Sequence, residues 1–299
     1  MIRVISVLEP SVLHARIDEW REDGFASAFE ARWIDLIDVI GDSRKAGLDH
    51  DLLTSLALEA LVWDGEHCPA WTVDSGARQR LIPLFYQRLM PLMRSVDAID
   101  GSTLSVVPAL DARPPQDAWL QSALAILSWA ASQPDALIVQ VGLDGSVDRV
   151  AAIEREGTEA RTVPLCHNYT ECITGLPLVE AIAGIDSSRL SAILKLSLAD
   201  FEARNPGRRA LYEYAFSDRF CDLFDSVPAA MRRHIVDSLV VRITLPRHEA
   251  QAHKGLKDEP LSGRDGWRRM RVTQDWRIHY RDNPHHVIFE TVGTHDFDL

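Results

Sequence analysis

A strong helix stop lies about two thirds of the way along this chain, at Asn205-Pro206-Gly207. Proline does not continue a helix and glycine favours the conformation that ends one, so the helical pattern over 171–204 stops there. At 299 residues the chain is long enough for about two domains. We therefore predict one domain over 1–170, a helical connector over 171–209 and a second domain over 210–299.

The first 170 residues are typical of an α/β domain. Apolar runs predict strands over 2–8, 104–110 and 135–142, and helical periodicity predicts helices over 26–40, 49–63, 78–96 and 116–131. The strand, helix, strand order over 104–142 predicts a parallel pair of strands. Two short runs on either side of a Glu-Gly turn, 149–153 and 160–165, predict a hairpin.

Residues 210–299 have a different order, which is typical of an α+β domain. They predict one strand over 211–216, two helices over 217–225 and 226–243, and a loop over 244–266. An antiparallel three-stranded sheet is expected to follow over 267–272, 276–281 and 286–292. Pro228 lies just inside the start of the longer helix, where its missing N–H costs nothing.

Charge is distributed unevenly along the chain. The formal net charge of −12 argues against a uniformly basic nucleic-acid-binding protein. The first 210 residues hold 19 Lys and Arg against 30 Asp and Glu, whereas residues 211–299 hold 13 against 14. Six arginines lie between Arg264 and Arg281. We therefore expect a local basic face on an otherwise acidic molecule.

Two classes of protein are not expected from this sequence. No window approaches the ~20 consecutive apolar residues of a membrane span, and the first ten residues contain Arg3 and Glu9 where a signal peptide needs an apolar core. We expect a cytoplasmic protein without a membrane partner.

The four cysteines are too scattered for a disulfide framework, and Cys166-His167 with Cys172 matches no standard zinc spacing. Reduced thiols and no metal site are expected.

The last three predicted strands alternate polar and apolar residues. Since successive side chains of a strand point to opposite faces, Trp276, Ile278 and Tyr280 are expected on the core side. The opposite face then carries cationic and aromatic side chains from two adjacent strands: Trp267, Arg269, Arg271, Arg277, His279 and Arg281. His295 follows just after the last strand. Guanidinium groups bind phosphate and an imidazole titrates near neutral pH, so this pattern indicates a phosphate-binding surface with titratable groups.

Three short segments in this region carry a family resemblance. They are Pro-Leu-x-Gly at 260–263, Asp-Trp-x-x-x-Tyr at 275–280 and Gly-Thr-His at 293–295. With the order of the predicted elements, they resemble the RelE/ParE superfamily of bacterial toxins, and most closely the YafQ-like mRNA interferases, over roughly 211–299. The resemblance implies an RNA endonuclease that acts without metal, usually on mRNA in the ribosomal A site. In this chemistry the 2′-hydroxyl attacks the adjacent phosphate.

The resemblance also implies roles for individual residues. His295 matches the catalytic histidine of Gly-Thr-His and is the candidate general acid, and Asp275 matches an acidic residue that orients an imidazole or shares the proton. Arg277 matches an arginine of RelE proper, and Arg271 stands where YafQ-like members have a histidine. Glu259 occupies the place of another such histidine, so the base could be a carboxylate.

Further residues are expected to contact the RNA, and some positions depart from the family. The expected contacts are Lys254, Lys257, Trp267, Arg268, Arg269, His279 and Arg281. Thr291 replaces a family arginine, and no tyrosine follows His295, which leaves Phe297 as the candidate stacking ring. These departures leave open a ParE-like module that binds a protein target and cuts nothing.

The long N-terminal region indicates control of the C-terminal domain. The fusion is similar in architecture to CRISPR-associated effectors of antiviral defence, in which a ligand-sensing CARF domain is joined to a RelE-like nuclease. That analogy implies a cyclic oligonucleotide activator and a homodimer formed through the N-terminal region. A second hypothesis makes the acidic region a built-in inhibitor that covers the arginine face, as an antitoxin would, through the segment 171–204. The expected partners are mRNA and the ribosome.

Overall fold

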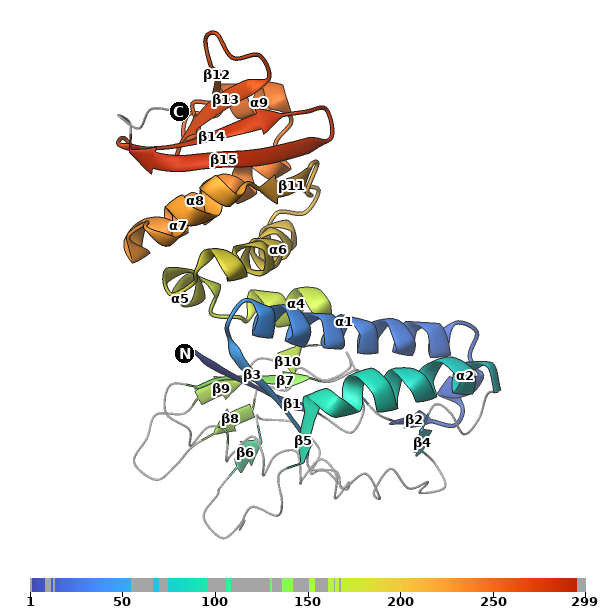
Figure 1. Cartoon of the computed structure of the whole chain (residues 1–299). Coiled ribbons are helices and arrows are strands. Elements are labelled where there is room, and N and C mark those ends of the chain that lie inside the picture. Colours follow the sequence, from blue (N-terminus) through green and yellow to red (C-terminus); the bar gives the residue numbers. More distant parts are fainter. Residues whose placement is uncertain are drawn as a thin grey trace. The chain divides into compact units, whose positions relative to one another are not determined.

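The computed structural model describes residues 2–8, 12, 14–54, 67–69, 75–95, 106–108, 130, 136–141, 151–153, 161–163, 165–166 and 168–294. The chain forms two compact units (Figure 1). The first unit comprises Met1–Arg44 and Leu48–Leu176, and the second comprises Lys45–Gly47 and Pro177–Leu299. The second unit therefore includes most of the segment that the sequence assigns to a connector. Each unit is described by itself.

The first unit is built on a five-stranded sheet of order β10-β7-β1-β3-β5. Its strands are β1 (Arg3–Leu8), β3 (Asp49–Thr54), β5 (Met93–Ser95), β7 (Ala136–Val141) and β10 (Leu165–Cys166). All of the pairings are parallel. From β1 the chain proceeds through β3 to one edge, and it then returns to add β7 and β10 on the other side of β1. This order is that of a doubly wound α/β fold, whose direction reverses between β1 and β7.

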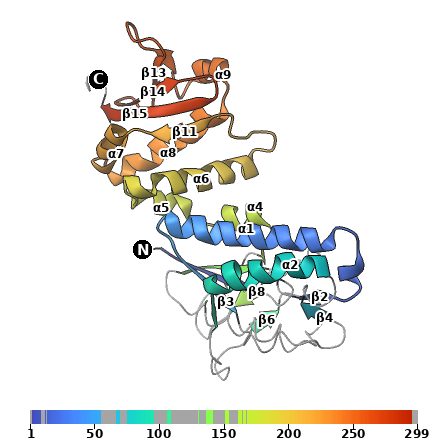
Figure 2. The same ribbon diagram turned by 45° about the vertical axis from the view of Figure 1, so that its right-hand side comes forward.

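Helices connect the parallel strands of this sheet. The helix α1 (Phe25–Lys45) links β1 to β3 and buries an apolar stripe that includes Phe29, Trp33 and Ile40. The helix α2 (Ser75–Pro83) continues through a π-helical turn, Leu84–Leu89, and a 3₁₀ turn, Met90–Leu92, into β5. The two helices lie side by side (Figure 2), with the ring centroids of Trp33 and Phe85 5.6 Å apart. Strand, helix, strand units of this kind need the long crossovers that the helices supply.

A buried histidine ties α1 to the sheet. His50 on β3 makes hydrogen bonds with Ser6 Oγ at 2.7 Å through Nε2 and with Ser43 Oγ at 2.6 Å through Nδ1. Since Ser43 donates its own proton to the Ile40 carbonyl, it accepts from Nδ1, and Ser6 donates to Nε2. Burial, and then the charge of Arg44, lower the pKa of His50 to about 3. The imidazole is therefore neutral at neutral pH.

The structure corrects three predictions for this unit. The helix predicted over 78–96 is wrong at 93–95, which form β5. The helix predicted over 49–63 is wrong at 49–54, which form β3, and 55–66 lie outside the described residues. The predicted parallel pairing of 104–110 with 135–142 is also wrong. Instead β6 (Val106–Pro108) pairs antiparallel with β8 (Ala151–Ile153), and β7 pairs with β1 and β10. The hairpin prediction is confirmed, since β8 pairs antiparallel with β9 (Arg161–Val163). Most of 116–131 lies outside the described residues.

The remaining small elements of the first unit are peripheral to the parallel sheet. The strands β2 (His14–Arg16) and β4 (His67–Pro69) pair antiparallel, and a 3₁₀ turn spans Glu19–Arg21. The short helix α4 (Tyr169–Thr174) follows β10 and is capped by the Asn168 side chain, which accepts from the Glu171 N–H. This cap supplies an acceptor for one of the N–H groups that a helix start leaves unpaired.

The second unit contains a five-stranded sheet of order β11-β15-β14-β13-β12. Its strands are β11 (Glu213–Phe216), β12 (Glu259–Pro260), β13 (Trp267–Arg271), β14 (Trp276–Asp282) and β15 (His286–Thr294). The strand β11 is parallel to β15, and the other pairings are antiparallel. The predicted order of one strand, two helices and three antiparallel strands is confirmed. The short strand β12 and a helix, α9 (Arg247–Ala252), lie inside the segment predicted as a loop.

Helices cover one face of this sheet (Figure 1). They are α7 (Asp218–Asp225) and α8 (Ala229–Thr244), with α5 (Leu178–Ala183) and α6 (Ser187–Arg204) packed against α8. Ser217 fixes the start of α7, because its Oγ accepts from the Phe220 N–H while its own N–H donates to the Phe289 carbonyl of β15. The rings of Phe220 and Phe289 are fully buried, 6.1 Å apart. We call the covered side the core face and the other side the polar face.

None of the helices in the described ranges combines the length and the apolar composition that a bilayer crossing requires.

Candidate functional site

The strand register places the predicted basic residues in three rows on the polar face. Trp267 lies opposite Arg281, Arg269 opposite His279, and Arg271 opposite Arg277. The prediction that these six side chains share one face is confirmed by this pairing. Directly opposed side chains on one face lie ~5 Å apart at Cβ, so each of the three rows brings its two side chains into contact range.

Carboxylates neutralise two of these arginines. Glu259 on β12 accepts from the guanidinium of Arg269 at 2.6 Å, and Glu290 on β15 pairs with Arg281. Both contacts are partly exposed, and exposed ion pairs contribute ~0–1 kcal/mol. Of the four arginines in these rows, Arg271 and Arg277 are the two that make no ion pair with a carboxylate among the described residues, and we call them the arginine pair.

The arginine pair lies at the end of the sheet where the β13–β14 turn meets the end of β15. Arg277 donates through Nη1 to the carbonyls of Thr273, Gln274 and Trp276, at 2.7, 2.9 and 2.9 Å. These bonds fix the turn and hold the guanidinium beside it. Burial, and then the charges of Arg271 and Arg269, lower the pKa of Arg277.

Arg271 has a donor without an acceptor. Its Nε atom is buried and makes no hydrogen bond with any of the described residues. A buried donor left unpaired costs ~1–3 kcal/mol. Like charges directly opposite each other on a sheet are also destabilising. An anion between Arg271 and Arg277 would relieve the repulsion between their charges.

His279 is buried beneath this face instead of being presented on it. Its side chain makes a hydrogen bond of 2.9 Å between Nδ1 and Thr291 Oγ1, and the residue is 8% exposed. Burial, and then the charges of Arg269, Arg264, Arg219 and Arg277, lower the pKa of His279 to about 4. The imidazole is therefore neutral at neutral pH. The expectation that it is exposed for RNA contact is wrong.

Arg268 is a second correction to the expected RNA contacts. Because it alternates with Trp267 and Arg269 on β13, its side chain points to the core face, where the residue is 7% exposed. A buried guanidinium needs carboxylate partners, and Arg268 Nε lies 3.1 Å from Asp258 Oδ1. Arg268 is therefore a buried core residue and is not presented to RNA on the polar face.

Arg268 belongs to a buried cluster that also contains Arg242, Asp258, Tyr280 and Asp282. The Tyr280 hydroxyl donates to Asp258 Oδ1 at 2.7 Å and accepts from Arg242 Nε at 2.8 Å. Asp282 lies 3.0 Å from the Nη2 atom of Arg242. Burial raises the pKa of Tyr280, so its hydroxyl stays protonated and can serve as both donor and acceptor.

Arg219 is a residue that the sequence prediction missed. It is exposed on the first turn of α7, and its charge contributes to the lowered pKa of His279. The pairing of Phe216 with Phe289 brings the start of α7 beside β15. This placement follows from a parallel pairing between the first and last strands of the sheet, which no local pattern indicates.

The other predicted residues lie around the same face or outside the described ranges. Asp275 is exposed in the β13–β14 turn beside Arg277, and Lys254 and Lys257 are exposed before β12. Gly293 pairs with Arg277 and Thr294 pairs with Trp276, so β15 ends at the arginine pair. His295 follows Thr294 directly in the sequence; it lies outside the described residues, as does Phe297.

Two further observations concern cysteines, metals and the predicted inhibitory segment. Cys166 and Cys172 are buried free thiols, and the described residues contain no group of three or more His, Cys, Asp or Glu placed to hold a metal. Within the second unit, α5 and α6 pack against α8, which covers the core face. The contact predicted between the segment 171–204 and the arginines is therefore not made by residues 178–204.

Solved structures that resemble this chain include a bacterial toxin-antitoxin complex and an archaeal RelE-RelB complex. No family model matches the sequence, and no curated protein matches it. A chain of the E. coli DinJ-YafQ toxin-antitoxin complex is 23% identical over 28% of this chain and 93% of its own, with a TM-score of 0.23. YafQ from E. coli strain BL21(DE3) is 26% identical over the same shares, with a TM-score of 0.22. The archaeal RelE-RelB complex from Pyrococcus horikoshii OT3 has 15% identity over 29% and 99%, with a TM-score of 0.24. Scores of this size carry no conclusion about this chain.

Proposed function

We propose that the second unit is a metal-independent endoribonuclease of the RelE type, which cuts mRNA on the ribosome. The observation that supports this proposal best is the arginine pair: Arg271 and Arg277 lie opposite each other, and Arg271 Nε is buried without an acceptor among the described residues. An RNA phosphate between the two guanidiniums would accept hydrogen bonds from their outer nitrogens and relieve their repulsion. The family motifs around these residues name the same chemistry.

The proposed reaction uses the groups around the arginine pair. A base removes the proton of the 2′-hydroxyl, the oxygen attacks the adjacent phosphorus, and an acid protonates the 5′-oxygen that leaves. Arg271 and Arg277 stabilise the extra negative charge of the phosphorane. The base is assigned to a carboxylate, Glu259 or Asp275, because the imidazole of His279 is buried. His295, which follows the strand that ends at Arg277, is assigned as the acid.

The test is cleavage of mRNA bound to ribosomes, followed by primer extension with the full chain. Replacing Arg271, Arg277 or His295 by Gln should each lower the cleavage rate about 10²- to 10³-fold, the usual loss when one transition-state donor is removed. Arg233→Gln is the matched control, because Arg233 is an exposed arginine of α8, 53% exposed in its ion pair with Asp237. Unchanged cleavage in the three variants would overturn the assignment, and binding without cleavage by the native chain would favour a ParE-like module.

We further propose that the first unit senses a ligand, a cyclic oligonucleotide, and controls the nuclease. Doubly wound sheets bind ligands outside the carboxyl ends of their strands, at the point where the strand order reverses. Here that point lies between β1 and β7, beyond Leu8 and Val141. Cleavage should rise when cyclic oligoadenylate is added to the full chain, and sedimentation with and without it tests the proposed homodimer. Equal rates with and without the ligand would refute this regulation.

A further inference from the structure

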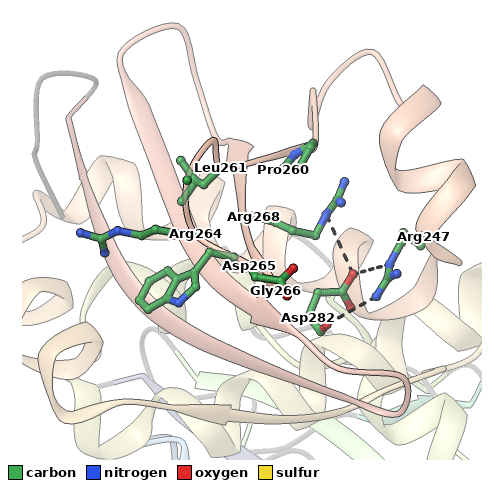
Figure 3. Close-up of a pocket in the computed structure, with 10 residues that line it drawn as sticks. Arg247, Pro260, Leu261, Arg264, Asp265, Gly266, Arg268 and Asp282 are labelled. Carbon is green, nitrogen blue, oxygen red and sulfur yellow. Dashed lines mark hydrogen bonds and ion pairs between the residues drawn. The ribbon is translucent and has the colours of Figure 1, made fainter.

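The second unit has a cavity of about 600 Å³ at the start of β13, beyond the first row of the polar face (Figure 3). It is lined by the loop that joins β12 to β13 and by side chains from α9, β13 and β14: Arg247, Pro260, Leu261, Gly263, Arg264, Asp265, Gly266, Trp267, Arg268 and Asp282. This volume is within the range of small-molecule sites, which is ~300–1,000 Å³.

The loop that forms this cavity has a defined conformation. The Leu261 N–H donates to the Trp267 carbonyl at 2.9 Å, and the Asp282 N–H donates to the Gly266 carbonyl at 3.1 Å. Gly263 and Gly266 have φ values of 78° and 73°, which glycine adopts without strain. The cavity is therefore held open by the backbone.

The charges behind the cavity are not balanced. Three guanidinium groups, those of Arg242, Arg247 and Arg268, share two carboxylates, Asp258 and Asp282, while Tyr280 remains neutral. One positive charge is left over in a group of side chains that, apart from Arg247, is buried. An excess charge that is partly shielded from water attracts a counter-ion more strongly than one in open water.

Arg247 places this excess at the cavity wall (Figure 3). Its side chain is 52% exposed, with Nε 2.6 Å from Asp282 Oδ2 and Nη2 3.4 Å from the Asp282 carbonyl. These contacts use Nε and Nη2, and neither uses Nη1. Trp267 also lines the cavity, with the guanidinium of Arg264 5.5 Å from its ring centre. A phosphate beside Arg247 and a base beside Trp267 would both be accommodated.

We propose that this cavity is a second nucleotide site, which binds one phosphate and base of the RNA at a distance from the scissile bond. Trp267 precedes Arg271 by four residues on β13, a separation of about 13 Å at a rise of ~3.3 Å per residue. A short extended single strand crosses the polar face over this distance. The inference rests on the proposed function for the identity of the ligand as RNA, while the anion site itself rests on the charges and the cavity.

The experiment measures binding without cleavage. A labelled RNA with 2′-O-methyl groups lacks the attacking hydroxyl, so its anisotropy with the full chain reports affinity alone. Arg247→Ala should weaken binding about tenfold and lower the slope of log K against log salt by about 1, as expected for one lost phosphate contact. Arg247→Lys should lose less. Arg233→Ala removes the same charge from an arginine that is exposed to the same degree, 53% against 52% for Arg247, and should stay within about twofold of the native chain.

A second probe, AMP, separates the two sources of a nucleotide phosphate. Displacement of the RNA by micromolar AMP would make a free nucleotide the ligand, whereas displacement only at millimolar AMP assigns the site to the RNA strand. Equal affinities of Arg247→Ala and Arg233→Ala for both probes, with matching thermal unfolding curves, would overturn the inference. Arg247-dependent binding by a chain that cuts no ribosome-bound mRNA would instead refute the proposed function and keep the nucleotide site.

Discussion

The burial of His279 predicts a specific dependence of stability on pH. The pKa of its imidazole is lowered from 6.5 to about 4 in the folded protein. One pKa unit corresponds to ~1.4 kcal/mol, so the shift corresponds to about 3 kcal/mol. The unfolded chain binds a proton near pH 6.5 and the folded chain only near pH 4. Between these values the unfolded state holds more protons, so this contribution to stability is complete above pH 6.5 and is lost as the pH falls toward 4.

The perturbation is His279→Asn, measured by urea unfolding of the full chain at several pH values between 7.5 and 4.5. Asparagine does not titrate, so the stability difference between the native chain and the variant should shrink by about 2–3 kcal/mol as the pH falls through this window. His248→Asn, at an exposed histidine of α9, should leave the pH dependence of the native chain in place. The lowered pKa of His50, in the first unit, also makes stability fall with pH, but it does so equally in the native chain and the variant. Its contribution therefore cancels in the difference between them.

Ring proton chemical shifts from NMR give the pKa of His279 directly, and the variant assigns the resonance. A midpoint near 6.5, or a stability difference that is the same at pH 7.5 and 4.5, would refute the claim that the imidazole is buried and neutral. That result would also return His279 to the set of residues available to protonate or contact the RNA.

Three further substitutions test other parts of the second unit by urea or thermal unfolding. Tyr280→Phe leaves Arg242 and Asp258 each short of a buried hydrogen bond and should lower the free energy of unfolding by ~2–4 kcal/mol. The control Tyr214→Phe removes a hydrogen bond of 3.5 Å and should lower it far less. Equal losses of stability in the two variants would contradict the buried cluster. Arg271→Met should raise stability by up to ~1 kcal/mol by removing the repulsion from Arg277, and a lower melting temperature would contradict it. Lys257→Gly should stabilise by up to ~1 kcal/mol, because its φ is 42°, and a loss would show that no strain is stored there.

The sequence predicted the sheet of the second unit well because one of its faces is polar. Arg277, His279 and Arg281 alternate with apolar residues, and that period of two identifies both the strand and its two faces. The strand β3 has no such signal. It is buried on both faces, so Leu52 and Leu53 are adjacent and both covered, and its sequence resembles a piece of an apolar helix.

The candidate site was predictable only in part, for the same kind of reason. The pairing of Arg271 with Arg277 follows from alternation and a short turn. The burial of Arg268 depends on Asp258 and Asp282, which lie 10 and 14 positions away and reach it only through tertiary packing. Arg219 reaches the site because β11 pairs with β15, a contact between strands more than 70 positions apart that no local pattern encodes.

The position of β15 has a consequence for when this unit is completed during synthesis. It is the last strand of its sheet to be synthesised, yet it lies between β11 and β14. Without β15, the strands β11 and β14 are not joined in one sheet. About 80 residues separate Glu213 from Thr294, which corresponds to several seconds of translation at ~5–20 residues per second. Until β15 is present, β11 has no strand to pair with, and the β13–β14 hairpin, with both members of the arginine pair, lacks its partners Thr291 and Gly293. A nascent chain that ends before β15 therefore lacks a complete site.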